Sequence, residues 1–193
     1  MLVFVSILLS FLAPQSDARI SGDLNCTVYN GTTFVYSPSA VACSNFISDV
    51  SCSVLYPSAT TFDGYPTAGG EQERPLACYT TAAATPAAIV QDLKGVAIRS
   101  CPKSCGLCCL TEAYNCPNAA GPRLTCSTIT TAQCLSPVWR PIIATDCPSA
   151  CGLCNENGCV DAVVDCANDP SICRTVGMQD FVLQYCKRTC NLC

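Results

Sequence analysis

One cysteine pattern, repeated three times, constrains this chain more than any other feature of its sequence. Segments 101–108, 147–154 and 186–193 all follow the spacing C-x3-C-x2-C. On a helix these positions are i, i+4 and i+7, so the three sulfur atoms of a segment lie along one stripe and face the same packed interior. Each stripe therefore needs three partner cysteines elsewhere in the chain.

The density of cysteine makes the redox compartment decisive. The chain has 20 cysteines in 193 residues, which indicates a disulfide scaffold in an oxidising compartment or metal clusters in a reducing one. Residues 1–13 form an apolar run that suits a signal peptide and is too short to cross a bilayer. Ser16 and Ala18 provide the small residues of a cleavage site. We therefore expect residues 1–18 to be a signal peptide, the protein to be secreted and extracellular, and no later segment to span a membrane.

The net charge of −4 and the absence of histidine exclude several classes of function. Nucleic acid and anionic lipid need a concentrated basic surface, so neither is an expected partner. Without histidine, Ser-His-Asp, Cys-His and His-zinc chemistry are ruled out. C-x3-C-x2-C also occurs as an iron–sulfur ligand pattern, but an oxidising compartment converts the required thiolates to disulfides. We expect no catalytic site, no metal, no cofactor and no enzymatic activity.

Each of the last two repeats forms a six-cysteine unit, with boundaries 110–154 and 159–193. The three cysteines before the ending are Cys116, Cys126 and Cys134 in one unit and Cys159, Cys166 and Cys173 in the other. Chains below about 40 residues rarely fold on apolar burial alone, so crosslinks are the expected remedy in the shorter unit. Six cysteines can pair in many ways, and spacing alone does not choose among them.

Two further residues of the third unit belong to a known pattern. Asp161 follows the first cysteine by two positions, and Thr189 directly precedes the fifth. With this spacing the unit resembles the six-cysteine domain named after the sea-anemone potassium-channel toxin ShK, a family abundant in secreted nematode proteins. The second unit resembles the same family, although Asn118 stands in place of the Asp. The resemblance also implies a structural salt bridge between Asp161 and Arg188.

The family resemblance implies a pairing of first to sixth, second to fourth and third to fifth cysteine. In the third unit the implied pairs are Cys159–Cys193, Cys166–Cys186 and Cys173–Cys190. In the second unit they are Cys116–Cys154, Cys126–Cys147 and Cys134–Cys151.

Residues 19–109 are interpreted as an expanded, degenerate copy of the unit. Its third-to-fourth gap would be 48 residues against 12 in the other two units. The same pairing rule gives Cys26–Cys108, Cys43–Cys101 and Cys52–Cys105. Cys78 and Cys109 are then left over, and we expect them to pair because an unpaired thiol is a liability in a secreted chain.

The local patterns predict short helices and little β structure. Asn30-Gly31 between two strand-like runs predicts a hairpin near residues 27–36. Residues 53–77 have no lasting periodicity and are expected to form an exposed loop. A capping residue followed by proline predicts a helix start at 85–86, 136–137 and 169–170, the first helix ending near Arg99. The expected fold class is small and disulfide-rich, with tandem ShK-like units.

Two positions match the N-glycosylation acceptor pattern, and Asn30 is a better candidate than Asn25, whose neighbour is a cysteine. For channel block, the toxin's characteristic contact is a lysine followed by an aromatic residue before the fourth cysteine. The third unit has Asp180 and Phe181 at these positions, and a negative charge cannot enter a cation-selective pore. Lys94, near the first ending, is expected to be a solvated position on an amphipathic helix.

These patterns favour a secreted, non-enzymatic extracellular binding or matrix protein stapled by disulfides. Its partner would be an extracellular protein or a matrix component of unknown identity. The alternative is a diffusible, toxin-like effector that modulates an ion channel or a receptor.

Overall fold

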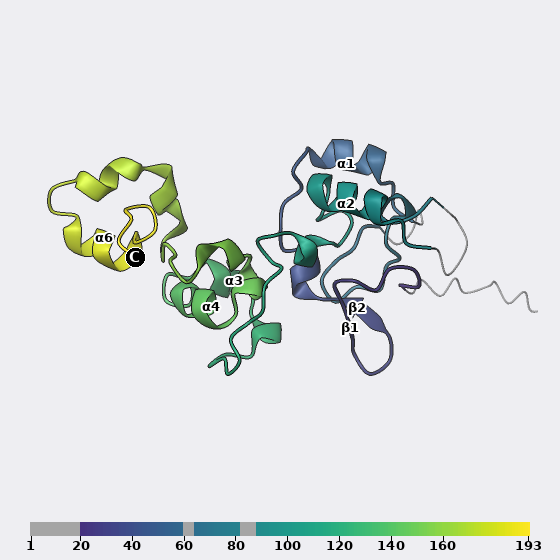
Figure 1. Ribbon diagram of the computed structural model, residues 1–193, viewed down its shortest axis with the longest axis horizontal. Helices are drawn as coiled ribbons and strands as arrows, with labels where there is room; N and C mark the ends of the chain where they lie inside the picture. The colour runs from purple at the N-terminus through teal and green to yellow at the C-terminus, as the bar shows by residue number, and fades with distance from the viewer. Residues whose placement is uncertain (1–19, 60–63, 82–87) are drawn as a thin grey trace, which may run out of the picture.

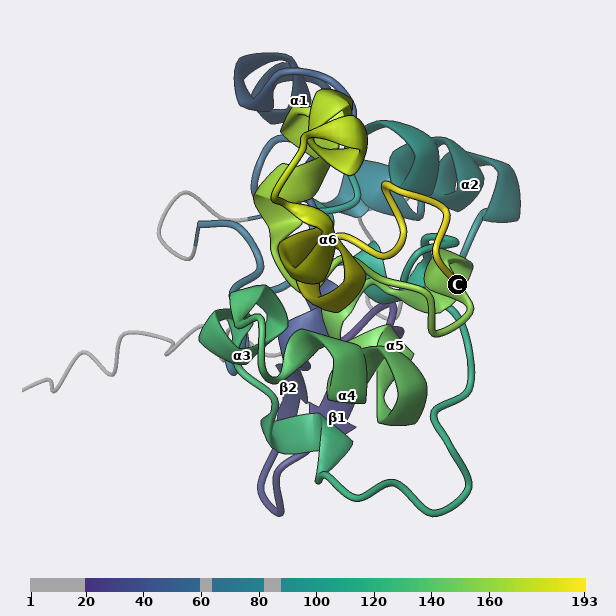
Figure 2. The ribbon, with the colours of Figure 1, turned by 90° about the vertical axis from the view of Figure 1, so that its left-hand side faces the viewer.

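Three lobes follow one another along the chain in the computed structural model (Figure 1). The structure describes residues 20–59, 64–81 and 88–193. The expected signal peptide, residues 1–18, and the predicted helix start at 85–86 lie outside the described residues. We refer to residues 20–109, 110–154 and 159–193 as the first, second and third unit. Figure 2 looks along the row of lobes, with α6 of the third unit toward the viewer.

The first unit begins with a hairpin of two short antiparallel strands. Strands β1 (Thr27–Tyr29) and β2 (Phe34–Tyr36) pair with Val28 opposite Val35. The amide oxygen of Asn30 accepts hydrogen bonds from the backbone N–H groups of Thr32 and Thr33, and Gly31 has a φ of 98°. This turn geometry suits an Asn-Gly pair. The hairpin expected at residues 27–36 is confirmed.

All α-helices in the described part of the chain are short. They are α1 (Asp49–Leu55), α2 (Gln91–Ser100), α3 (Thr131–Leu135), α4 (Arg140–Asp146), α5 (Pro148–Cys151) and α6 (Gln179–Tyr185). In each unit one helix, α2, α4 or α6, ends directly before the fourth cysteine. Helix α1 and the hairpin lie at opposite ends of the first unit in both ribbon views (Figures 1 and 2). No helix among the described residues is long and apolar enough to cross a membrane. The short helices and the single two-stranded hairpin of the described residues agree with the predicted local structure.

Local capping explains several helix starts. Ser48 accepts a hydrogen bond from the backbone of Ser51 at the start of α1, and Thr130 and Gln133 form a capping box at the start of α3. The start predicted at 136–137 is displaced, because a turn occupies residues 137–139 and α4 begins at Arg140 with a proline in its first turn. The start predicted at 169–170 yields only a 3-10 helix, Pro170–Arg174.

Buried disulfides make up much of the interior. In the first unit Cys52, Cys78, Cys101 and Cys105 are buried in one cluster, where Leu107 and Tyr79 pack against them. The second unit has a cluster around Ile143 and Leu153 that also includes Val160, which belongs to the third unit. The second and third units therefore share apolar packing at their junction.

The exposed loop expected at residues 53–77 is wrong for much of its length. Helix α1 includes residues 53–55, and the segment near Gly69 and Gly70 forms backbone hydrogen bonds with Tyr36 of β2. Arg74 and Pro75 are fully buried. The polar sequence around Arg74 suggested that its side chain is exposed to solvent. The side chain is instead buried, and a buried carboxylate, described below, neutralises its charge.

Candidate binding surface

The bridges of the second and third units match the family pairing. The second unit contains Cys116–Cys154, Cys126–Cys147 and Cys134–Cys151. The third unit contains Cys159–Cys193, Cys166–Cys186 and Cys173–Cys190. These are the pairs that the resemblance implies.

The pairs expected for the first unit, Cys26–Cys108, Cys43–Cys101, Cys52–Cys105 and Cys78–Cys109, are all wrong. The structure instead contains Cys26–Cys109, Cys43–Cys108, Cys52–Cys101 and Cys78–Cys105. The error lay in the choice of the six cysteines, because Cys78 is the third cysteine of the unit and Cys43 is the first. With that choice the family pairing holds in all three units.

Spacing contained a signal for this assignment. Eight residues separate Cys43 from Cys52, close to the nine and six residues between the first two cysteines of the other units. Taking Cys78 as the third cysteine also shortens the third-to-fourth gap from 48 to 22 residues. The bridge Cys26–Cys109 lies outside the six-cysteine frame and ties the N-terminal hairpin to the end of the first unit.

The salt bridge expected between Asp161 and Arg188 is also wrong. Both carboxylate oxygens of Asp161 accept hydrogen bonds from Thr189, one from its backbone N–H at 3.0 Å and one from its hydroxyl at 2.7 Å. Arg188 forms an ion pair with Glu156, which lies between the second and third units. Thr189 satisfies both oxygens of the Asp161 carboxylate, and the guanidinium of Arg188 pairs with Glu156 instead. Arg140 of α4 donates to the backbone carbonyl of Asp161 and adds a second contact across the junction.

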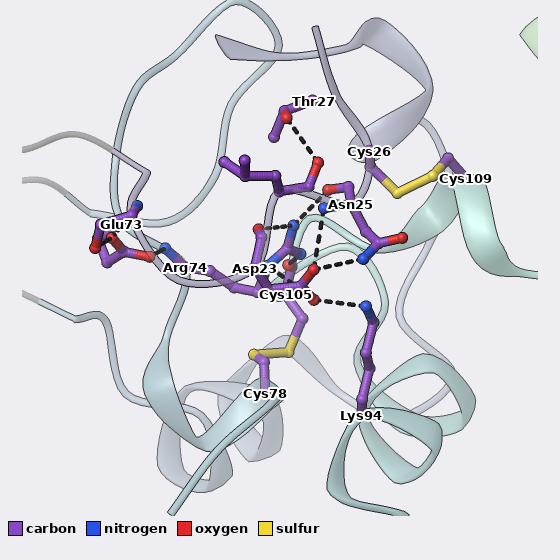
Figure 3. A network of polar contacts seen from close by, with 12 residues as sticks. Asp23, Asn25, Cys26, Thr27, Glu73, Arg74, Cys78, Lys94, Cys105 and Cys109 are labelled. Carbon is purple, nitrogen blue, oxygen red and sulfur yellow. Dashed lines mark hydrogen bonds and ion pairs between the residues drawn. A yellow bond between two sulfur atoms is a disulfide. The ribbon is translucent and has the colours of Figure 1, made fainter. Parts of the chain in front are cut away.

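A buried charge cluster fixes the N-terminal segment of the first unit (Figure 3). The ammonium of Lys94 lies 2.7 Å from the carboxylate of Asp23, and Nε of Arg74 lies 3.8 Å from the same oxygen. Arg74 also donates to backbone carbonyls of Asn25 and Cys105. Lys94 is therefore a buried ion-pair partner, and the expectation that it is solvated is wrong.

Burial and hydrogen bonding act in opposite directions on Asp23. Burial by itself raises the pKa of the carboxyl group, but hydrogen bonds from Asn25 and Lys94 stabilise the carboxylate, and the net pKa is below the ordinary value of 3.8. The cluster holds its charges in place for structure. A lysine used in this way is not available to enter a pore.

The two glycosylation candidates differ in their surroundings. The side-chain amide of Asn25 donates to Asp23 at 2.6 Å, so this exposed residue is tied to the edge of the buried cluster. Asn30 is exposed at the tip of the hairpin. Both residues are exposed, but within the described residues only Asn25 donates from its side-chain nitrogen to a neighbouring carboxylate.

An apolar groove lies where the first unit meets the second. Its volume is about 840 Å³, and its lining includes Phe46, Ile98, Arg99, Leu110, Glu112 and Tyr114. The hydroxyl of Tyr114 donates to the carbonyl of Ala42 at 3.0 Å, and its ring lies against Gly152, so the junction is packed on both sides. A concave, largely apolar groove with a few charged groups is the usual form of a binding site. No sequence pattern indicated this groove, because segments far apart in the chain build its walls.

The cysteines are committed to structure. All 20 form disulfides, which leaves no thiolate among them for metal binding or nucleophilic attack. Phe181, the aromatic candidate for channel contact, packs against Tyr185 with ring centroids 5.0 Å apart.

Fold and bridges define a class: tandem small domains held together by disulfides rather than by a large apolar interior. The model of the ShK domain-like family matches residues 94–108, 114–154 and 158–193. The chain therefore belongs to the ShK domain-like family. In the first unit the match covers only residues 94–108, from within α2 to the end of the cysteine ending, because the rest of that unit is expanded. The expected fold class, small and disulfide-rich with tandem ShK-like units, is confirmed. No curated protein and no solved structure matches the chain.

Proposed function

We propose that this protein is secreted and acts as a non-enzymatic extracellular binding protein of the matrix type. The observation that carries the proposal is the complete set of ten disulfides in three family-type units. Disulfides persist in oxidising compartments, and small extracellular domains depend on them where apolar burial is limited. Rigid units of this kind suit persistent contact with other extracellular molecules.

The junction groove is the contact surface in this proposal. Its walls are fixed by the bridge Cys43–Cys108 and by the hydrogen bond from Tyr114 to Ala42. Because these walls need no reordering on binding, little conformational entropy opposes a contact there. Residues 1–18 would direct export, and Asn30 would carry a glycan away from the groove, at the tip of the hairpin.

The diffusible effector is the competing function. Channel block by Lys94 is disfavoured because that side chain is buried and paired with Asp23. An effector would also need to be free in the secreted fluid.

Secretion and matrix retention can be measured together. The full chain would be expressed in cells that export it, and the medium and the detergent-washed matrix would be compared. We expect the mature chain to begin at Arg19, to lose mass on glycosidase treatment unless Asn30 is replaced by Gln, and to remain mainly in the matrix fraction. A control chain with Cys78→Ser and Cys105→Ser, which lacks a core bridge of the first unit, should be retained less.

Free protein in the medium that alters currents or signalling in responsive cells would contradict the matrix function and support the effector. Retention of the chain inside the cell would contradict secretion.

A further inference from the structure

The groove has a protruding side chain at its edge. Phe46 lines the groove and yet is 68% exposed, an unusual position for a phenylalanine. Ile98 and Leu110 supply further apolar lining. The same patch of surface thus contains both an aromatic projection and an apolar hollow large enough to receive one.

The backbone at Phe46 is fixed by hydrogen bonds of this residue and of the one before it. Its backbone N–H donates to the carbonyl of Ser100 at 2.9 Å. The preceding residue, Asn45, accepts from the backbone of Lys103 and Ser104 and donates to Asp49 at 2.8 Å. A contact made from a backbone held in this way needs little ordering of the main chain.

Two side chains of opposite charge lie in the wall of the groove. Arg99 and Glu112 both line it, and both are exposed. Within residues 20–59, 64–81 and 88–193, neither forms an ion pair or a side-chain hydrogen bond. An occupant that satisfies both must present an anion to Arg99 and a cation to Glu112. A second copy of the same surface presents these two charges.

We propose that the occupant of the groove is a second copy of this chain, related by a two-fold axis. In a two-fold interface each contact occurs twice, so Phe46 of each copy enters the groove of the other. Arg99 of each copy then faces Glu112 of the other. The proposal rests on the proposed function only in taking the groove as the contact surface, and it names the partner.

Sedimentation of the purified, fully oxidised chain tests the pairing. We expect a concentration-dependent dimer that dissociates more readily at high salt, because the exposed charges are screened. Phe46→Ser should weaken the dimer by about 30-fold or more, as expected for a central aromatic contact. The matched control is Val138→Ser, which removes an exposed apolar side chain from the second unit and should leave the dimer unchanged.

A charge exchange distinguishes a second copy from any other partner surface. Arg99→Glu or Glu112→Arg alone should weaken the dimer by about tenfold, because like charges then face each other. The double variant should restore the dimer, because each copy again meets an opposite charge. Asp180→Arg on the third unit is the control for a charge reversal far from the groove, and disulfide mapping checks that each variant is folded.

Three results would overturn the inference. They are a monomer at all accessible concentrations, a dimer that is indifferent to Phe46→Ser, and a double charge variant that stays as weak as the single ones. Matrix retention of a monomeric chain would contradict the pairing and leave the proposed function intact. A dimer that the matrix does not retain would contradict the proposed function and leave the pairing intact.

Discussion

At the scale of single residues, the chain buries charge to hold its first unit together. Asp23 lies on the N-terminal segment, Lys94 on α2 and Arg74 on the connection between α1 and α2, and all three side chains are buried. The guanidinium of Arg74 also lies over the ring of Tyr36, 5.3 Å from its centroid. Burial of a charge is costly unless a partner compensates it, so the removal of one member should cost more than the loss of an exposed pair.

Lys94→Met tests this cluster. We expect the free energy of unfolding of the first unit to fall by about 3 kcal/mol at pH 7, because Asp23 would stay buried with only the more distant Arg74 as a cation. The carboxyl pKa in the folded state is below 3.8, so the pair stabilises the protein above that pH and the contribution is lost as the pH falls through the folded-state value. The difference between variant and wild type, measured by denaturant unfolding at each pH, should therefore shrink in acid.

The exposed Lys103→Met in the same unit is the control for that experiment and should change stability by less than about 0.5 kcal/mol. An equal loss at pH 7 for both lysine variants would contradict a buried ion pair.

At the scale of elements, the three cysteine endings share one backbone feature. The residue after the fifth cysteine is left-handed in every unit, with φ values of 60° at Gly106, 68° at Gly152 and 52° at Asn191. Glycine and asparagine are the residues that tolerate this conformation. In the second unit the ring of Tyr114 also lies against Gly152, where a Cβ would overlap it. The absence of a side chain at Gly152 therefore permits both the left-handed turn and the packing of Tyr114 at the junction of the first two units.

Gly152→Ala tests that dependence. The new Cβ would meet both the left-handed backbone and the Tyr114 ring, so we expect a loss of more than about 2 kcal/mol in the stability of the second unit. Gly177→Ala is the matched control, since Gly177 has a φ of 85° but nothing within 4 Å of an added Cβ. Its cost should be about 1 kcal/mol, from the backbone alone.

Thermal unfolding and hydrogen exchange would report the two losses for these glycine variants. Equal effects would mean that the ring contact with Gly152 contributes nothing.

At the scale of the whole molecule, disulfides replace an interior that apolar side chains do not supply. The two larger clusters of buried apolar residues are built around Leu107 in the first unit and Ile143 in the second, and both include half-cystines. Removal of a native bridge from such a domain typically costs about 2–5 kcal/mol. The identity of each pair therefore matters to the stability of the protein. It can be determined by replacing one cysteine and identifying the partner whose thiol is freed.

Cys78→Ser should free the thiol of Cys105. Alkylation of the unreduced variant, followed by peptide mass analysis, should place the label on Cys105, because these two residues are bridged in the structure. Cys173→Ser in the third unit, which should free Cys190, checks the method. A label on Cys109 would instead mean that the bridge first expected from the sequence is correct.

Sequence by itself determined the fold class and the position of the three cysteine endings. In the second and third units the resemblance to the family implied the pairing, and the rule could be applied without tertiary information because each unit contains only one set of six cysteines. Asn30-Gly31 fixed the hairpin locally, since its turn depends on residues adjacent in the chain.

Only the tertiary structure decided the first unit and the groove. Eight cysteines over a long, expanded segment left the choice of six open, and the answer depended on which distant segments pack together. Arg74 looked solvated because its partner Asp23 lies 51 residues away in the chain. The groove joins Phe46, Arg99 and Glu112 from separate segments, and local patterns carry no information about such long-range contacts.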